Sequence, residues 1–392
     1  MTGPTVAAGH TVGVEEEFLV AEPDSGRTLA AGPKILARPP VGLPDGALLH
    51  AELRETQVEA ATGVCAGEAD LRAHLLAARN WLVEQATAVD ALLVASGTPP
   101  LSFQSVVDEP SERFARIDYL YAGMVADYEA CGCHVHVGVP DPELAVAVVN
   151  RLRPWIPTLL ALSVNSPLWE GRDTGFGSWR MVQQSRFPGS GVPPYFADRA
   201  DHDAEVARLV ECGVLVDERM SFWLVRPSPT LPTIEFRVAD TAGTVDEAVL
   251  FALLTRALVR TTVLDVERGA PAPRPGEQVA AAAVWSAARH GLEGDGVDML
   301  RARRVPAVQL LRDLLHRVRP ALEETGDLSS VRRVLALIRA HGTGAERQRR
   351  AAARYGIPAA VRMLAAETAG HSGEGWEQSA AGTRSRNDGG DR

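Results

Sequence analysis

Apolar residues alternate with glutamates in the first strand-like segment of the chain, residues 11–21. Successive side chains of a strand point to opposite faces of its sheet, so Glu15 and Glu17 share one face. Glu16 and Phe18 share the other face with apolar neighbours. The pattern therefore predicts a strand that presents two carboxylates side by side.

A second acidic and apolar stretch, residues 51–62, predicts another strand, which carries Glu52 and Glu59 and ends at the turn-forming Gly63. Two carboxylates about 4 Å apart repel by about 4 kcal/mol at an effective dielectric near 20. A cluster gathered from several strands therefore needs metal ions, hydrogen-bond donors or protons. Oxygen-only ligands favour Mg2+ or Mn2+ over softer metals.

The rest of the hydrophobic pattern predicts a mixture of helices and strands. The expected elements are a helix at 68–95, a strand at 133–139, a helix at 142–152, a long ordered loop at 163–200 and strands at 221–225 and 233–238. From about residue 246 the chain is rich in alanine and leucine, which predicts a helical C-terminal part. Residues 1–10 are expected to be flexible, and the small polar residues 370–392 to form a disordered tail.

Composition limits the class of protein. With 392 residues, 46% hydrophobic and 23% charged, the chain can form one large or two modest domains. Its net charge of -10 argues against nucleic acid or an anionic membrane as a partner, because both require basic surfaces. Without a secretory signal or a bilayer-spanning run, we expect a cytoplasmic protein. Four cysteines are too few for a disulfide scaffold and are expected to be reduced thiols.

Two histidines, His134 and His136, share one face of the strand predicted at 133–139. A pair at this spacing can bind zinc, hydrogen-bond a phosphate or another substrate group, or form a satisfied pair within a sheet. The residues alone leave these three readings open. Cys131 and Cys133 flank the pair and are interpreted as core residues, since no second ligand pair for a structural zinc is evident.

Glu235 and Arg237 alternate with apolar residues and share a strand face in the segment 233–238. An acid and a base two residues apart can form a surface ion pair. Beside a metal and phosphate site, however, Glu235 would bind the cation and Arg237 would hold phosphate or carboxylate oxygens through its planar fork.

Four loop residues are candidates for substrate binding. Arg180 and Arg226 are arginines in sparsely charged loops, where an acidic substrate would need them. Asn165 and Ser166 can donate hydrogen bonds to an anionic ligand, although such segments more often form turns.

Taken in order, the motifs of this chain closely resemble the glutamate-cysteine ligase type 2 family, the YbdK-type carboxylate-amine ligases. The matching motifs are Gly-Val-Glu-Glu-Glu-Phe (13–18), Val-Glu-Ala-Ala-Thr-Gly-Val-Cys (58–65), Cys-Gly-Cys-His-Val-His-Val-Gly-Val (131–139), Ser-Val-Asn-Ser-Pro (163–167), Gly-Ser-Trp-Arg (177–180) and Pro-Thr-Ile-Glu-Phe-Arg-Val-Ala-Asp (232–240). Six ordered matches are more specific than any one of them. The resemblance covers about residues 11–368 and implies a single catalytic domain.

The resemblance implies an α+β, glutamine-synthetase-like catalytic fold, in which a curved antiparallel sheet is backed by helices. It also implies ATP and Mg2+ (or Mn2+) as cofactors, with an L-glutamate-like acid and an amine such as L-cysteine as substrates. By the same resemblance, the metal-binding glutamates are Glu15, Glu17, Glu52, Glu59 and Glu235. His134 and His136 would help to bind the nucleotide, and Arg237 would contact the transferring phosphate and act with Glu59 in catalysis.

The resulting hypothesis is a two-step ligation, including weak glutamate–cysteine ligase activity. ATP phosphorylates a substrate carboxylate, and an amine attacks the acyl phosphate to give an amide and inorganic phosphate. A zinc hydrolase built on His134 and His136 with Glu59 or Asp240 is the alternative from another class. A third reading is a catalytically idle paralogue that still binds ATP or an amino acid. The sequence leaves the natural substrates open, and also a homodimer through the helical C-terminal part.

Overall fold

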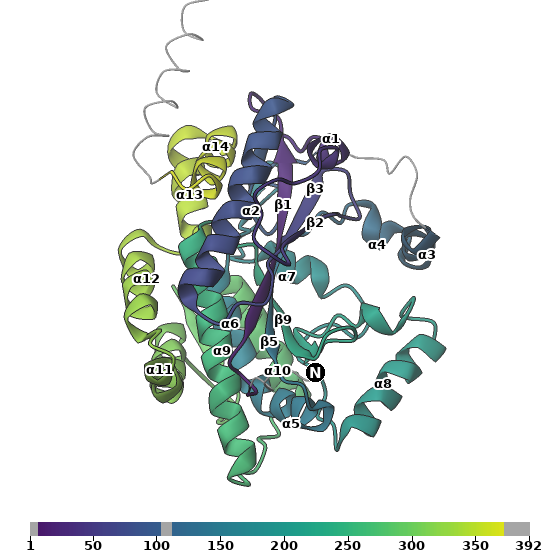
Figure 1. Ribbon diagram of the computed structural model, residues 1–392, viewed down its shortest axis with the longest axis vertical. Helices are drawn as coiled ribbons and strands as arrows, with labels where there is room; N and C mark the ends of the chain where they lie inside the picture. The colour runs from purple at the N-terminus through teal and green to yellow at the C-terminus, as the bar shows by residue number, and fades with distance from the viewer. Residues whose placement is uncertain (1–6, 103–111, 372–392) are drawn as a thin grey trace, which may run out of the picture.

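The computed structural model describes residues 7–102 and 112–371 of the chain. Within them, seven antiparallel strands form the central sheet in the order β2-β3-β1-β5-β9-β8, with β4 paired to the end of β1 (Figure 1). The strands are β1 (Val12–Ala21), β2 (Leu48–Ala51), β3 (Gln57–Ala61), β4 (Leu92–Val94), β5 (Gly132–Gly138), β8 (Val225–Pro227) and β9 (Thr233–Asp240). Strands that are far apart in the sequence thus lie next to one another.

Helices cover one face of this sheet. α9 (Val245–Glu267) packs against β5 and β1, α6 (Ile156–Ser163) against β9, and α5 (Pro142–Leu152) against α9 and β8. The apolar positions of β1, β5 and β9 join these helices in one hydrophobic core. Alternation along each strand leaves the other face for polar side chains. This arrangement confirms the predicted α+β fold with an antiparallel sheet backed by helices.

Glu16 lies on the helix-covered face of β1, where the alternation placed it. Arg79 of α2 (Glu68–Ala88) pairs with it, with Nη2 2.5 Å from Oε1 and Nε 3.0 Å from Oε2. Both side chains are almost fully buried, and Arg79 also donates to the carbonyl oxygens of Ala242 and Gly243. The pair therefore ties β1 and α2 to the start of the helical C-terminal part.

Two predicted elements around α2 differ from the structure. The helix expected at 68–95 ends at Ala88, because the residues after it form β4, whose pairing with β1 outweighs local helical spacing. The single strand expected at 51–62 is divided into β2 and β3 by a turn at residues 52–56. Glu52 consequently lies on this turn and not on a strand.

The segment predicted as a long ordered loop, 163–200, contains regular structure. It holds β6 (Leu168–Trp169), β7 (Arg172–Asp173), α7 (Trp179–Gln184) and the start of α8 (Arg199–Glu211). The strand expected at 221–225 begins only at Val225, where pairing with Phe236 of β9 starts. Hydrogen bonding between β8 and β9 sets this boundary, and the local sequence pattern does not show where that pairing begins.

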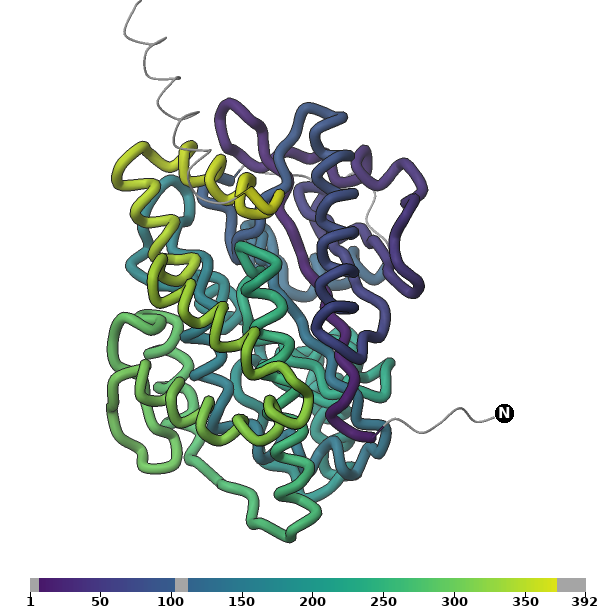
Figure 2. The backbone as a smooth tube through the Cα atoms, turned by 60° about the vertical axis from the view of Figure 1, so that its left-hand side comes forward, coloured from purple at the N-terminus to yellow at the C-terminus, as the bar shows by residue number. Residues whose placement is uncertain are grey.

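The C-terminal part is mainly helical from residue 245, as its composition predicted. It contains α10 (Glu277–His290), α11 (Ala307–Glu324), α12 (Leu328–His341), α13 (Gly344–Tyr355) and α14 (Ile357–Thr368), with a hairpin of β10 (Asp295–Asp298) and β11 (Arg303–Pro306). Val361 and Leu364 of α14 pack in one cluster with Leu19 of β1. The last helices therefore lie beside the first strand (Figure 2).

The open face of the sheet is bordered by α3 (Glu112–Tyr121) and α4 (Gly123–Ala126), which lie to the right of the strands in Figure 1. The predicted flexible ends fall mostly outside the described residues, which begin at residue 7 and end at 371. Within the described part, Gly9 N–H donates to Gly138 O at 2.8 Å. None of the helices described is long and apolar enough to cross a bilayer.

Candidate active site

Strand pairing brings the predicted glutamates and histidines together. The facing pairs are Glu17 with Glu59, Glu15 with His134, and Glu235 with His136. They come from β3, β1, β5 and β9, which are consecutive in the sheet in that order. Residues as far apart in the sequence as Glu15 and Glu235 thus form one polar surface opposite the helical layer.

Glu17, Glu52 and Glu59 form a cluster that we call the acidic group. Each offers a carboxylate oxygen, and the three oxygens lie within 4.8 Å of one another. Glu52 reaches the group from the turn after β2, while Gly132 N–H donates to Glu17 Oε2 at 2.5 Å. The sequence prediction of a shared carboxylate surface is therefore matched by the geometry of these three residues.

Charge in the acidic group is poorly compensated. Burial, followed by the charges of Glu52, Glu15 and Glu17, raises the pKa of Glu59 to about 10. Burial also raises the pKa of Glu17 and of Glu52 above the ordinary value. Three carboxylates that resist joint ionisation but offer only oxygen ligands fit a hard divalent cation.

Glu15, His136 and Glu235 form a second cluster, which we call the compensated group. One ligand atom of each lies within 4.8 Å of the others, and His136 Nε2 is 3.4 Å from Glu15 Oε1. Thr233 Oγ1 lies 2.9 Å from His136 Nδ1 and fixes the orientation of the ring. A mixed carboxylate and imidazole set can also hold a divalent metal, because carboxylates suit Mn2+ and imidazole suits the later transition metals.

Nearby cations neutralise the compensated group. Glu235 is only 3% exposed, and its carboxylate accepts hydrogen bonds from Arg226 Nε at 2.8 Å and from Arg237 Nη1. Burial alone would raise the pKa of Glu235, but the charges of Arg237 and Arg226 hold it well below its usual value. Burial likewise opposes ionisation of Glu15, and the hydrogen bonds of His134 and His136 lower its pKa despite this.

His134 connects the two groups. Its Nδ1 lies 3.5 Å from Glu15 Oε2 and 3.8 Å from Glu17 Oε1, and its Nε2 accepts from Arg180 Nη2 at 3.4 Å. A guanidinium only donates, so Nε2 is the acceptor and Nδ1 carries the proton. Burial, with the charge of Arg237, lowers the pKa of His134, which favours this neutral form.

A cavity of about 300 Å³ opens beside the acidic group. Glu17 and Glu52 line it together with Arg180, Arg226 and Arg237. The cavity therefore combines carboxylates, which can hold cations, with arginines, which can hold anions. Both arginines predicted from the loops, Arg180 and Arg226, lie at this site, although Arg226 belongs to β8 and Arg180 to α7.

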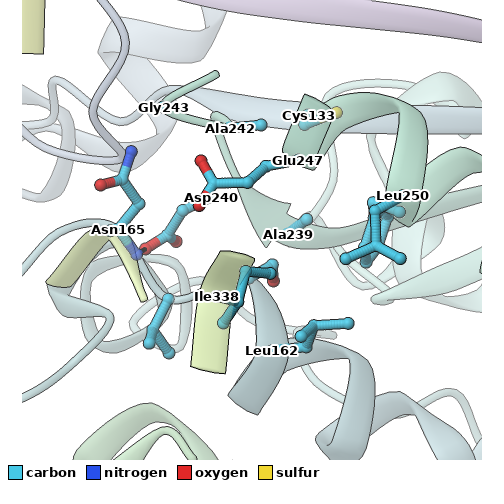
Figure 3. Close-up of a pocket in the computed structure, with 14 residues that line it drawn as sticks. Cys133, Leu162, Asn165, Ala239, Asp240, Ala242, Gly243, Glu247, Leu250 and Ile338 are labelled. Carbon is cyan, nitrogen blue, oxygen red and sulfur yellow. Dashed lines mark hydrogen bonds between the residues drawn. The ribbon is translucent and has the colours of Figure 1, made fainter. Parts of the chain in front are cut away.

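Asn165 and Ser166 were predicted to donate hydrogen bonds to an anionic ligand, but neither lines the large cavity. Asn165 N–H and Ser166 Oγ donate to Asp240 Oδ2 at 2.8 and 2.7 Å, so they serve a buried network. Figure 3 shows Asn165 and Asp240 beside a smaller cavity of about 30 Å³, between the sheet and the helical layer. That volume suits one or two water molecules and not a substrate.

Other cavity residues had no distinguishing signal in the sequence. They include Gln57, Arg113, Tyr128, Gln184 and Arg219. These residues come from β3, α3, the segment after α4, α7 and the segment before β8. Because each belongs to a different part of the chain, only the tertiary arrangement brings them together.

A third cluster, at the start of α2, is a poor metal site. Cys65, Asp70 and His74 have ligand atoms within 4.8 Å of one another. However, His74 Nδ1 accepts from Gly63 N–H at 3.2 Å, so the proton of the neutral ring occupies Nε2. Burial and the charge of Asp70 raise the pKa of Cys65 to about 11, which disfavours the thiolate that a metal needs.

The family model described as glutamate-cysteine ligase family 2 matches residues 11–377 of the chain. A relative from Saccharopolyspora erythraea, named "Putative glutamate--cysteine ligase 2-2", is 54% identical over 369 residues, which are 93% of this chain and 94% of the relative. A relative from Salinispora arenicola, "Putative glutamate--cysteine ligase 2", is 45% identical and covers 93% and 97% of the two chains.

Solved structures resemble this fold at low sequence identity. A glutamate–cysteine ligase from Francisella tularensis in complex with AMP superposes with a TM-score of 0.68 at 13% identity, covering 98% of this chain and 96% of the other. A bifunctional glutathione synthetase from Pasteurella multocida gives 0.60 at 16% identity, over 92% and 51% of the two chains. These structures show the fold. The family match over nearly the whole described chain, together with the motifs and the two relatives, shows that the protein belongs to glutamate-cysteine ligase family 2.

Proposed function

We propose that this protein is an ATP-dependent carboxylate–amine ligase, which forms an amide through an acyl phosphate. The observation that carries the proposal is the acidic group at the wall of a cavity that Arg180, Arg226 and Arg237 also line. Such a cavity can hold the cations of a metal–nucleotide complex with its carboxylates and phosphate or carboxylate oxygens with its arginines. Both partners of a phosphoryl transfer to a carboxylate carry that chemistry.

The proposed acid is L-glutamate or a close analogue, and the proposed amine is L-cysteine or a similar amino compound, with ATP converted to ADP and phosphate. Family membership and the names of the two relatives support these substrates. The AMP in the structure from Francisella tularensis supports a nucleotide for the fold. A cytoplasmic location and a homodimer through the C-terminal helices stay predictions.

Mg2+ or Mn2+ would be held by Glu17, Glu52 and Glu59. The compensated group offers ligands for a second ion. The raised pKa of Glu59 supports this assignment, since a cation would relieve the repulsion that burial and the neighbouring carboxylates cause. When bound, such ions would offset the negative charge that develops on the phosphate oxygens.

The chain's own arginines would position the anionic groups. Arg226 is fixed by Glu235 and by the carbonyl oxygens of Arg219 and Ser221, each 2.8 Å from its Nη1. Arg237 donates to Glu235 as well, which leaves its guanidinium oriented along the cavity wall. Fixed donors of this kind stabilise developing charge without reorganising during the reaction.

The proposal is tested by phosphate release from ATP in the presence of Mg2+, glutamate and a panel of amines that includes cysteine. We expect amine-dependent release, accompanied by the amide product. Glu59→Ala should lower the rate by about a hundredfold or more, because loss of a direct ligand should cost at least as much as the roughly 10–100-fold seen for residues that only support a ligand. Glu55→Ala is the matched control, because Glu55 lies on the same turn as Glu52 but outside both ligand groups.

Three outcomes would contradict the proposal. Activity of Glu59→Ala at the level of the control would remove the acidic group from the mechanism. Stoichiometric zinc with hydrolysis that needs no ATP would favour the hydrolase. Thermal stabilisation by ATP and Mg2+ without any product would favour the idle paralogue.

A further inference from the structure

Asp240, at the end of β9, is completely buried, yet its carboxylate connects two other parts of the chain. Oδ2 accepts from Asn165 N–H at 2.8 Å and from Ser166 Oγ at 2.7 Å, and Oδ1 accepts from Ser178 Oγ at 2.7 Å. Asn165 and Ser166 follow α6, and Ser178 precedes α7. One carboxylate thus joins β9 to the segments after α6 and before α7.

A bulge brings Asp240 to this place. Pairing between β5 and β9 shifts between Cys133 and Val135, so that Ala239 lies opposite Cys133 and Asp240 opposite Gly132. The simple alternation of Glu235 and Arg237 is therefore interrupted before the strand ends. Bulges next to active sites commonly re-aim a side chain in this way.

The two serines that donate to Asp240, Ser166 and Ser178, also bond to the backbone of α7. Ser178 is the N-cap of this helix and accepts from Met181 N–H at 3.1 Å, while Ser166 Oγ accepts from Arg180 N–H at 3.1 Å. A hydroxyl has one proton to donate, and in each serine Asp240 receives it. The first turn of α7, including the backbone of Arg180, is therefore held against Asp240.

The side chain of Arg180 lies in a narrow slot over β5. Its Nη1 and Nη2 each donate to Arg237 O at 3.3 Å, and Nη2 is 3.4 Å from His134 Nε2. A Cβ atom at Gly132 would lie 2.4 Å from Arg180 Nη2, so only glycine leaves room for the guanidinium. Arg180 is 3% exposed but lines the large cavity, so a small displacement of α7 would move it out of this slot.

We propose that Asp240 is a positioning residue of the ligase site, which acts through Ser166 and Ser178 to hold Arg180 over Gly132 and against His134. The inference rests on the proposed function, in which Arg180 contributes to binding an anionic substrate. It gives Asp240 a role that needs no contact with substrate, metal or nucleotide. It also gives the fully buried Ser166, which does not line the large cavity, a supporting role behind the site.

The experiment is a double-mutant cycle on Ser178 and Arg180. Ser178→Ala removes one donor to Asp240, and we expect kcat/KM for glutamate or for ATP to fall about tenfold, through KM more than through kcat. In the Arg180→Ala background the same serine substitution should change kcat/KM less than twofold, since substitutions of residues that act as one unit are not additive. Ser178→Thr keeps the hydroxyl that donates to Asp240, so it should recover most of the loss.

Thr255→Val is the matched control. It also removes a completely buried hydroxyl, but one whose hydrogen bonds to the described residues stay within α9, to Phe251 O and Ala252 O. Its kinetic constants should equal those of the unmodified protein at similar melting temperature. Equal losses for Ser178→Ala in both backgrounds, or losses that follow the melting temperature across all variants, would overturn the inference and leave the ligase proposal standing.

A binding measurement separates the two proposals. Dissociation constants for ATP with Mg2+, and for glutamate, are measured by calorimetry on the same four proteins of the cycle. If the unmodified protein binds but forms no amide, the ligase proposal fails, and non-additive losses in these constants would still support the role of Asp240. Additive losses, or no binding of either compound by the unmodified protein, would overturn the inference.

Discussion

The acidic group and the compensated group lie at the same sheet face and contain similar residues, but the pKa values of their glutamates are shifted in opposite directions. Burial and mutual repulsion raise the pKa values of the glutamates in the acidic group. Arg226 and Arg237 hold the pKa of Glu235 far below its usual value in the other. Among the described residues, the ion pairs of the acidic group include no arginine. The surroundings of the acidic group, and not its glutamates alone, therefore favour the cation that we propose for it.

The largest expected difference concerns Glu235→Gln. The substitution keeps the shape of the side chain but leaves the buried guanidinium of Arg226 without its carboxylate. We expect the free energy of unfolding to fall by about 3–5 kcal/mol, the usual cost of breaking a buried pair. Urea denaturation measures the change, and Glu55→Gln provides the control. A change below about 0.5 kcal/mol, the usual range for surface sites, would show that the pairing does not stabilise the fold.

Mg2+ should stabilise the protein through the acidic group. At one hundred times its dissociation constant, a ligand that binds only the folded state adds about 2.7 kcal/mol. We expect a rise in melting temperature on adding Mg2+ to protein freed of metal with EDTA. Glu59→Gln should show a much smaller rise, because it removes a charged ligand. Equal rises in both proteins would place the ion elsewhere.

Glu59→Gln should also separate stability from activity. Without metal at neutral pH, the folded protein must keep a proton on Glu59, because burial and the neighbouring carboxylates raise its pKa to about 10. The amide needs no proton, so we expect the free energy of unfolding to rise by about 1 kcal/mol, of the order of one pKa unit of proton uptake. With substrates and Mg2+, ligation should be lost. Urea denaturation in EDTA tests the first expectation and the phosphate assay the second. A metal-free variant less stable than the unmodified protein would contradict the account of this group.

The sequence predicted which face of a strand each side chain lies on better than it predicted which residues that side chain contacts. Alternation in β1 correctly separated Glu15 and Glu17 from Glu16, because side-chain direction is a local property of a strand. Local pattern could not show that Arg79 would pair with Glu16, or that a bulge would place Asp240 opposite Gly132. The family resemblance, which the family match confirms, supplied the grouping of distant glutamates that periodicity could not give.

Cavity residues show the same limit. Arg180 was expected at the site because it is a charged residue in a sparsely charged segment, and it does line the large cavity. Tyr128 and Gln184 line it too, although nothing in their local sequence differs from an ordinary surface or core position. Ser166 was expected to bind a ligand directly, but its hydroxyl donates to Asp240. Local composition identifies residue chemistry, whereas hydrogen-bond partners depend on packing.

The smallest expected difference is in the dependence of stability on pH. A carboxyl whose folded-state pKa exceeds its unfolded value keeps a proton that the unfolded chain has lost, so stability falls as pH rises between the two values. For Glu59 this window extends from about 4.3 in the unfolded chain to about 10 in the folded protein. The melting temperature in EDTA should therefore fall between pH 6 and 9 by more in the unmodified protein than in Glu59→Gln.

Mg2+ should reduce this dependence on pH, because the ion competes with the proton for the same oxygens and binds more tightly as they ionise. Melting curves at pH 6 and pH 9, with EDTA and with Mg2+, give four values for each protein. The compensated group makes the opposite contribution, since the depressed pKa values of Glu15 and Glu235 favour the folded state above the pKa of an unfolded glutamate and lose that effect only in acid. If Glu59→Gln leaves the slope in EDTA unchanged, the pH response of the sheet face does not come from the acidic group, and the contrast between the two groups is contradicted.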